Sequence, residues 1–145
     1  MEILRFRWFV LLAGIALLLF AYWRAEIAEA FIAFLVGIGG GLLLDWIGVA
    51  KFHFWEYSRQ PFPSWKYFAI TLPCWGILGM AINLLWNWIA IPWLAFLLIT
   101  VTLMALHELL NLKTKSWEYF VPLWLVVVGW IPLILSFRGV FILLR

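Results

Sequence analysis

Six side chains suited to acid–base chemistry fall on or near the same end of the expected helices in a largely apolar sequence. Carboxyl groups confined at low dielectric do not all ionise, and a neutral carboxylic acid is a proton donor. Such an acid in an aromatic-lined cavity could protonate an alkene, and Trp or Phe faces would stabilise the resulting carbocation by cation–π attraction. We assign Asp45 and Glu108 as the acid–base pair and His107 as the group that orients them or relays protons. The six are Asp45, His53, Glu56, His107, Glu108 and Glu118.

A three-residue motif near these groups occurs twice, 62 residues apart. A chance match in apolar sequence is one explanation, but agreement in register over several segments favours an internal repeat. Trp and Tyr also anchor proteins at the membrane surface, which is the alternative reading of each motif. We expect the two motifs, together with Asn111, to bind substrate. The offset pairs Trp55-Glu56-Tyr57 with Trp117-Glu118-Tyr119, Ala33-Phe34-Leu35 with Ala95-Phe96-Leu97, Leu44 with Leu106, Lys51 with Lys113, and Asp45 with His107.

Asp45 belongs to a stripe of small residues at helical spacing. Small residues on one helical face let a second backbone approach closely, so the stripe predicts a tight helix–helix contact. A carboxylate in a membrane span costs about 2.5–3.5 kcal/mol on insertion scales, so Asp45 must be paired, hydrated or protonated. The alternative to a functional role is a packing Asp that is hydrogen-bonded to a neighbouring helix. The stripe consists of Ala33, Gly37, Gly41, Asp45 and Gly48.

The run from His107 to Asn111 invites comparison with the helix of zinc metallopeptidases. That helix carries His-Glu-x-x-His, which places two imidazoles on one metal ion. Here Asn111 stands where the second His is required, and a catalytic zinc normally has three protein ligands. Cys74 is the one cysteine, which excludes a multi-thiolate site. We therefore expect no metal and no other cofactor.

The composition is that of a membrane protein. The 145 residues are 68% hydrophobic and 12% charged, with a mean hydropathy of +1.08, whereas soluble domains are about half apolar and about one quarter charged. A helix crosses the hydrocarbon with about 20 apolar residues, and spanning segments must be helical because lipid offers the backbone no hydrogen-bond partners. We predict a single all-α domain, 1–145, that forms a polytopic membrane helix bundle. Its five transmembrane helices are expected at about 6–23, 27–50, 66–89, 92–111 and 118–137.

The expected helices form a parallel two-helix repeat, with units at about 27–89 and 92–137. Its symmetry axis would lie along the membrane normal, and repeats of this kind commonly form a site at their interface. Residues 138–145 are too short to cross the membrane, so they either extend the last helix or lie along the interface.

The positive charges predict an orientation in the cell membrane, the inner or plasma membrane. Cytoplasmic loops carry an excess of Lys and Arg, so the N-terminus should be cytoplasmic and the C-terminus outside. The net charge of +3 does not suggest a nucleic-acid partner. The N-terminal side holds Arg5, Arg7, Lys51, Arg59, Lys66, Lys113 and Lys115, and the other side holds Arg24, Arg138 and Arg145.

One extended pattern carries a family resemblance. An acidic residue, a spacer, Trp-x-Tyr, and then Pro and Trp occur as Asp45…Trp55-Glu56-Tyr57…Pro63-Ser64-Trp65. The pattern covers roughly 40–75 and, more weakly, 104–125. It resembles small bacterial multi-spanning proteins of uncharacterised function. More distantly it is similar to membrane carotenoid-modifying proteins of the lycopene-cyclase and carotenoid-hydratase types. The resemblance implies a protein that binds long isoprenoids between helices and uses buried carboxyl groups for acid chemistry.

Three functions remain open from the sequence, and it does not decide whether the protein is an enzyme. The first is binding or acid–base modification of a hydrophobic lipid or isoprenoid that enters from the cytoplasmic leaflet. The second is a small oligomeric proton- or ion-coupled transporter, because intramembrane Asp, Glu and His mark ion paths. The third is a non-catalytic assembly or scaffold subunit that uses the Gly37–Gly41 face. The expected partners are membrane lipids, a hydrophobic small-molecule substrate and a second copy in a homo-oligomer.

Overall fold

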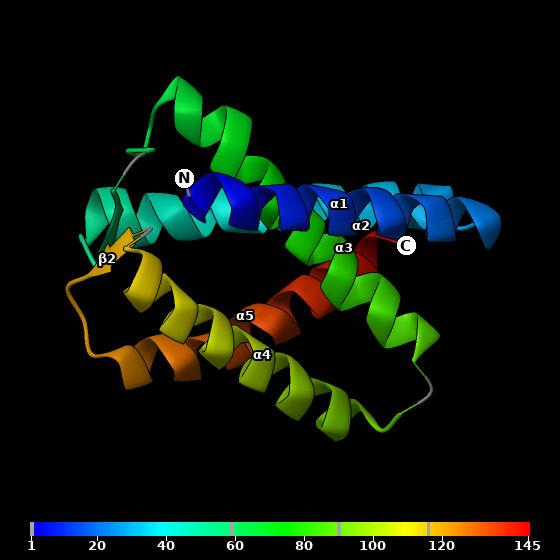
Figure 1. Ribbon diagram of the computed structural model, residues 1–145. Coiled ribbons are helices and arrows are strands. Elements are labelled where there is room, and N and C mark those ends of the chain that lie inside the picture. The colour runs from blue at the N-terminus through cyan, green and yellow to red at the C-terminus, as the bar shows by residue number, and fades with distance from the viewer. Residues whose placement is uncertain (1, 59, 90, 116) are drawn as a thin grey trace.

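Helices account for most of the structure, a computed structural model that describes residues 2–58, 60–89, 91–115 and 117–145 (Figure 1). Two π-helical segments extend the helices, η1 (Trp46–Lys51) after α2 and η2 (Tyr67–Thr71) before α3. Two short strands, β1 (Trp55–Tyr57) and β2 (Trp117–Tyr119), pair with each other. The expected all-α helix bundle is confirmed, with this small sheet added. The α-helices are α1 (Glu2–Trp23), α2 (Ile27–Asp45), α3 (Leu72–Trp88), α4 (Trp93–Thr114) and α5 (Leu123–Leu144).

In the part of the chain that the structure describes, four segments are long and apolar enough to cross a membrane. The first helix, α1, has 22 residues, but the apolar part of it that the structure describes in full, Trp8–Trp23, is shorter. The protein is therefore consistent with embedding in a membrane, while the first of the five expected spans stays a prediction. Arg59, one of the charges used for the orientation, lies outside the described residues. The four segments are Ile27–Lys51, Tyr67–Trp88, Trp93–Lys113 and Leu123–Leu144.

The last helix differs from the expected span of 118–137. Residues 117–119 form β2, and α5 begins only at Leu123, directly after Pro122. Pairing with β1 holds the start of the expected span in extended form. Since α5 continues to Leu144, most of the segment 138–145 extends the fifth helix, which is one of the two alternatives left open by the sequence.

The small-residue stripe on α2 packs against α3, as its spacing predicts. All five stripe residues are buried. The two backbones meet at Gly37 and Gly79, where a Cβ added to Gly79 would lie 2.6 Å from the Cα of Gly37. Gly41 lies against the indole of Trp75 in the same way. Because α3 of the same chain occupies this face, the face is not available to an assembly partner.

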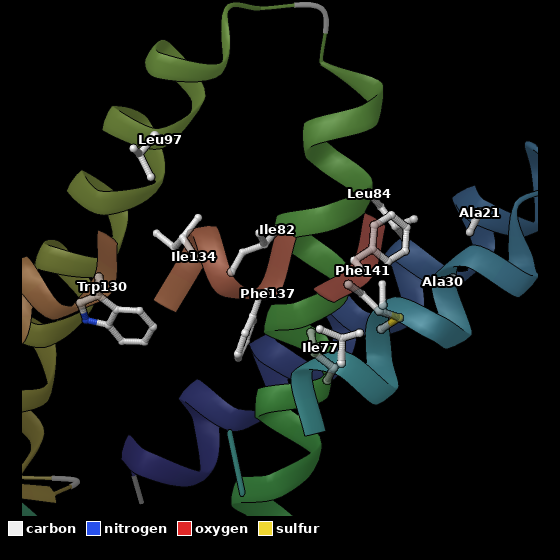
Figure 2. Packing of buried hydrophobic residues seen from close by; sticks show 13 residues of the cluster. Ala21, Ala30, Ile77, Ile82, Leu84, Leu97, Trp130, Ile134, Phe137 and Phe141 are labelled. Atoms are coloured by element: carbon white, nitrogen blue, oxygen red, sulfur yellow. The ribbon is translucent and has the colours of Figure 1, made fainter. Parts of the chain in front are cut away.

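The main apolar core lies among α1, α2, α3 and α5 (Figure 2). Helix α5 contributes Ile134, Phe137 and Phe141 to this core, and α4 contributes Leu97. A second, smaller cluster beside the sheet contains Tyr57 and Tyr67. Lipid tails are as apolar as these side chains, so close packing rather than exclusion of water stabilises such a core.

The two helix pairs are arranged differently (Figure 1). Helices α2 and α3 are in backbone contact at their glycines. Helix α4 ends and α5 begins on the side of the molecule where β2 lies, and the two helices cross in this view.

The sheet connects the two halves of the chain, α2–β1–α3 and α4–β2–α5. The strands are antiparallel, and the central residues, Glu56 and Glu118, face each other. Each Trp pairs with the Tyr of the other strand. The amide of Phe120 also donates to the carbonyl of Phe54 at 2.8 Å. This register is the one that a local two-fold axis through the sheet would produce, consistent with the expected repeat.

Candidate functional site

In each Trp-Glu-Tyr strand, the Trp and Tyr side chains point to one face of the sheet and the Glu side chain points to the other. Successive side chains of a strand point to opposite sides. The Trp and Tyr side chains of both motifs line a cavity among the helices. Glu56 and Glu118, which we expected to bind substrate, are exposed and are not among the cavity-lining residues.

The cavity has a volume of about 620 Å³ and lies between α3, the α4–α5 hairpin and the sheet. This size is within the range of about 300–1,000 Å³ that is common for small-molecule sites. Its wall is mostly aliphatic and aromatic, and no Lys or Arg is among the described residues that line it. The polar side chains that reach the wall include Tyr57, Thr71, His107, Glu108 and Tyr119.

Asp45 is fully buried and accepts four side-chain hydrogen bonds. Tyr57 Oη and Trp55 Nε1 donate to Oδ1 at 2.8 and 3.2 Å. Tyr67 Oη and Trp75 Nε1 donate to Oδ2 at 2.6 and 2.8 Å. Four donors occupy about all the lone-pair positions of a carboxylate, which offsets the cost of burying it. Asp45 does not line the cavity; it lies behind the aromatic side chains that do, and it fixes their positions.

Glu108 is equally buried, but it forms part of the cavity wall. Tyr119 Oη donates to Oε2 at 2.6 Å, and Trp130 Nε1 donates to Oε1 at 3.0 Å. His107 Nδ1 lies 3.8 Å from Oε1, beyond hydrogen-bond distance, and its ring packs against Trp117 with centroids 5.2 Å apart. Glu108 and His107 are therefore the two acid–base candidates that a ligand in the cavity would meet.

The structural counterpart of Asp45 is Glu108. The 62-residue offset of the sequence repeat pairs Asp45 with the preceding residue, His107, instead. Each carboxylate accepts the hydroxyl of the tyrosine that ends the following strand, Tyr57 or Tyr119. The offset is thus 63 residues at the carboxylates and 62 at the strands. The π-helix η1 accounts for the difference, because a π-turn accommodates one more residue than the α-helical turn found at this place in α4.

Asn111 holds β2 in place rather than lining the cavity. Its Oδ1 accepts the amide of Trp117 at 3.1 Å, and its Nδ2 donates to the carbonyl of the same residue at 3.4 Å. In the first half of the chain, the carbonyl of Gly48 accepts the amide of Phe54 at 2.6 Å. A Cβ on Gly48 would collide with the ring of Trp55, so glycine is required for this tryptophan to lie there.

Three partners of the carboxylates were not predicted from the sequence: Tyr67, Trp75 and Trp130. They lie on the helices that follow the strands, far along the chain from the acids that they contact. Trp75 and Trp130 also pack against each other, with ring centroids 6.0 Å apart, so the two carboxylates are connected through two touching indoles. The excess of Trp in the composition was the available signal, but it does not identify which tryptophans are involved.

The two strand tyrosines remain hydrogen-bond donors across the biological pH range. Burial raises the pKa of the Tyr57 phenol well above its ordinary value, and the charge of Asp45 adds to the effect. Burial likewise raises the pKa of Tyr119, reinforced by Glu108. Both hydroxyls therefore keep the proton that they donate.

The remaining candidates do not join this site. His53 is exposed and stacks on Phe120, with ring centroids 4.6 Å apart and planes 13° from parallel. In the part of the chain that the structure describes, no three His, Cys, Asp or Glu side chains are grouped so that they could hold a metal ion. The six acid–base candidates therefore fall into three groups. Asp45 is enclosed by side chains, His107 and Glu108 line the cavity, and the other three are exposed: His53, Glu56 and Glu118.

Comparisons of the chain with protein-family models, with curated proteins and with solved structures give no match. The resemblance to carotenoid-modifying proteins therefore stays a prediction. The geometry of the cavity and of the two buried carboxylates near it is the basis for a function.

Proposed function

We propose that this protein binds a hydrophobic lipid or isoprenoid in the cavity between α3 and the α4–α5 hairpin. The observation that carries the proposal is a cavity of about 620 Å³ with aliphatic and aromatic walls and a buried carboxyl group, Glu108. Sites for small molecules are typically apolar concavities with a few placed polar groups. The sheet end of the cavity is the cytoplasmic end in the proposed orientation, so the ligand enters from the cytoplasmic leaflet.

Any acid–base reaction on the bound lipid would go through Glu108 and His107. Both line the cavity, and their side chains lie within 3.8 Å of each other. Asp45 acts indirectly, since its hydrogen bonds position Trp55, Tyr57 and Trp75 in the wall.

Native mass spectrometry of the gently released protein tests the proposal. We expect the wild-type protein to retain a lipid or isoprenoid of defined mass. Gly129 lines the cavity, and open space surrounds the position of an added Cβ, so Gly129→Leu should fill the site and release the bare chain. Gly139→Leu is the matched control on the same helix, since Gly139 also faces open space but does not line the cavity. A wild-type chain that is bare and also fails to bind added isoprenoids would overturn the proposal.

The two alternatives are less well supported by these contacts. A proton path between Asp45 and Glu108 would need groups that both accept and donate, but their connection runs through Trp75 and Trp130, whose indoles only donate. The scaffold hypothesis relied on the Gly37–Gly41 face, which α3 covers within the chain.

A further inference from the structure

We infer that the ligand carries a neutral hydroxyl group, which donates a hydrogen bond to Glu108. This inference rests on the proposed function and specifies the chemical class of the ligand: an apolar chain or ring system with an alcohol at the end that meets α4. The comparison of the two buried carboxylates leads to it.

Asp45 shows what a completed carboxylate site looks like in this protein. It accepts four side-chain donors, two on each oxygen. Glu108 accepts two such donors from the described residues, Tyr119 and Trp130, one on each oxygen. A carboxylate offers about four lone-pair positions, so about two acceptor positions of Glu108 remain.

The two missing donors have identifiable counterparts at Asp45. Trp55 donates to Asp45, whereas Trp117, in the same position of its motif, packs against His107 instead. Tyr67 supplies a hydroxyl to Asp45 from the helix after β1, and no described tyrosine on α5 does so for Glu108. Glu108 is buried and faces the cavity, and His107 Nδ1 at 3.8 Å lies beyond hydrogen-bond distance, so a ligand in the cavity could supply these donors. Each oxygen of Glu108 has one partner and can accept a second hydrogen bond, so a donating ligand gains affinity by adding a hydrogen bond to a charged group.

The charges around the cavity determine which kind of hydrogen-bond donor a ligand can present to Glu108. No Lys or Arg is among the described lining residues, so a phosphate or carboxylate ligand would meet the carboxylate of Glu108 with His107 as the one described lining side chain that could carry a compensating positive charge. All six side chains that hydrogen-bond to the two carboxylates among the described residues are neutral Trp or Tyr donors. A neutral hydroxyl reproduces what Tyr67 provides at Asp45, whereas an anionic head group does not.

A ligand series with the wild-type protein in phosphatidylcholine nanodiscs tests the inference. The probes are geranylgeraniol, its methyl ether, its monophosphate and the corresponding amine, with quenching of Trp fluorescence as the readout. We expect the alcohol to bind at least about tenfold more tightly than the ether, which lacks the donor. It should also bind more tightly than the phosphate, which is an anion, and than the amine, whose ammonium form loses its hydration in the apolar cavity.

Each outcome decides one question. Equal binding of alcohol and ether, or tighter binding of the phosphate or the amine, overturns the hydroxyl inference and leaves the hydrophobic site standing. No binding of any probe counts against the proposed function itself. As a second measurement, Glu108→Leu should abolish the preference for alcohol over ether, while Glu118→Leu, on the exposed face of the sheet, should keep it. A preference that persists in folded Glu108→Leu also contradicts the inference.

Discussion

Asp45 and Glu108 each accept a hydrogen bond from the tyrosine at the end of the strand that follows their own helix. The two carboxylates therefore connect the sheet to α2 and to α4 in the same manner. They differ in what completes them: side chains of the protein surround Asp45, whereas the cavity borders Glu108. The carboxylate is thus enclosed by side chains in one half of the chain and borders a cavity in the other.

Removal of a strand hydroxyl should therefore have unequal effects in the two halves. Tyr119→Phe leaves Glu108 with one of its two donors from the described residues, while Tyr57→Phe leaves Asp45 with three of four. Hydrogen bonds to charged groups contribute about 1.5–3 kcal/mol, so Tyr119→Phe should lower the free energy of unfolding by about that amount. We expect a smaller loss for Tyr57→Phe. Unfolding of the ligand-free protein by SDS titration measures both, and an equal or reversed order contradicts the donor count.

Asp45→Asn should destabilise the fold as well as the aromatic wall. An amide nitrogen in place of Oδ2 would face Trp75 Nε1, which is also a donor, and leave it without an acceptor. A buried donor that loses its partner costs about 1–3 kcal/mol. Glu56→Gln is the control, because a change on the exposed face of the sheet should stay within about 0.5 kcal/mol of the wild type. Unchanged melting temperature in Asp45→Asn would show that the four hydrogen bonds do not support the fold.

The contact of α2 with α3 predicts a difference between two nearby glycines. Gly37→Leu would drive its side chain into the backbone at Trp75 and Gly76, whereas Gly39 faces open space. Overpacking costs about 1–3 kcal/mol and can cost more where backbone is the obstacle. We expect Gly37→Leu to lower the melting temperature strongly and Gly39→Leu to leave it nearly unchanged. Similar melting temperatures of the two variants would argue against close packing of these helices.

The π-helix η1 should tolerate a deletion that a regular helix does not. Removal of the exposed Ala50 would convert the π-turn into an α-turn while keeping the residues on both sides near their places. Removal of Ala105 from α4, which is α-helical, would rotate the preceding residues by one helical step. We expect the first variant to fold with modest destabilisation and the second to fail in expression or melt much earlier. Equal tolerance would mean that η1 does not hold an extra residue.

The proposed orientation can be tested by cysteine labelling. In a Cys74→Ser background, Arg24→Cys should react with a membrane-impermeant maleimide added to intact cells. Lys115→Cys, at the sheet end of the bundle, should react only after the membrane is made permeable. The reverse pattern would place the N-terminus outside and move the entry of the ligand to the other leaflet.

The helices and the α2 stripe were predictable because their signals are local. Hydropathy identifies long apolar segments, and spacings of three and four place Gly37, Gly41 and Asp45 on one face. The strands were not predictable: three residues of Trp-Glu-Tyr become extended only because a second copy pairs with them. For the same reason the sequence did not indicate that Glu56 and Glu118 would point away from the cavity.

The site was only partly predictable for a related reason. Asp45, His107 and Glu108 stand out as ionisable groups in apolar sequence, but burial and partners decide their roles. The donors that enclose Asp45 come from up to 30 residues away, and η1 shifts the register by one residue. Neither the enclosure of Asp45 nor the open side of Glu108 can be read from spacing.

The sheet also bears on how a chain of this kind can be assembled. Antiparallel Trp-Glu-Tyr strands are self-complementary, because each aligns its first residue with the last residue of the other and its centre with the other centre. Two separate copies of a helix–strand–helix unit could therefore associate through identical edges. The pairing of α2–β1–α3 with α4–β2–α5 through this sheet has the register that two such separate units would form.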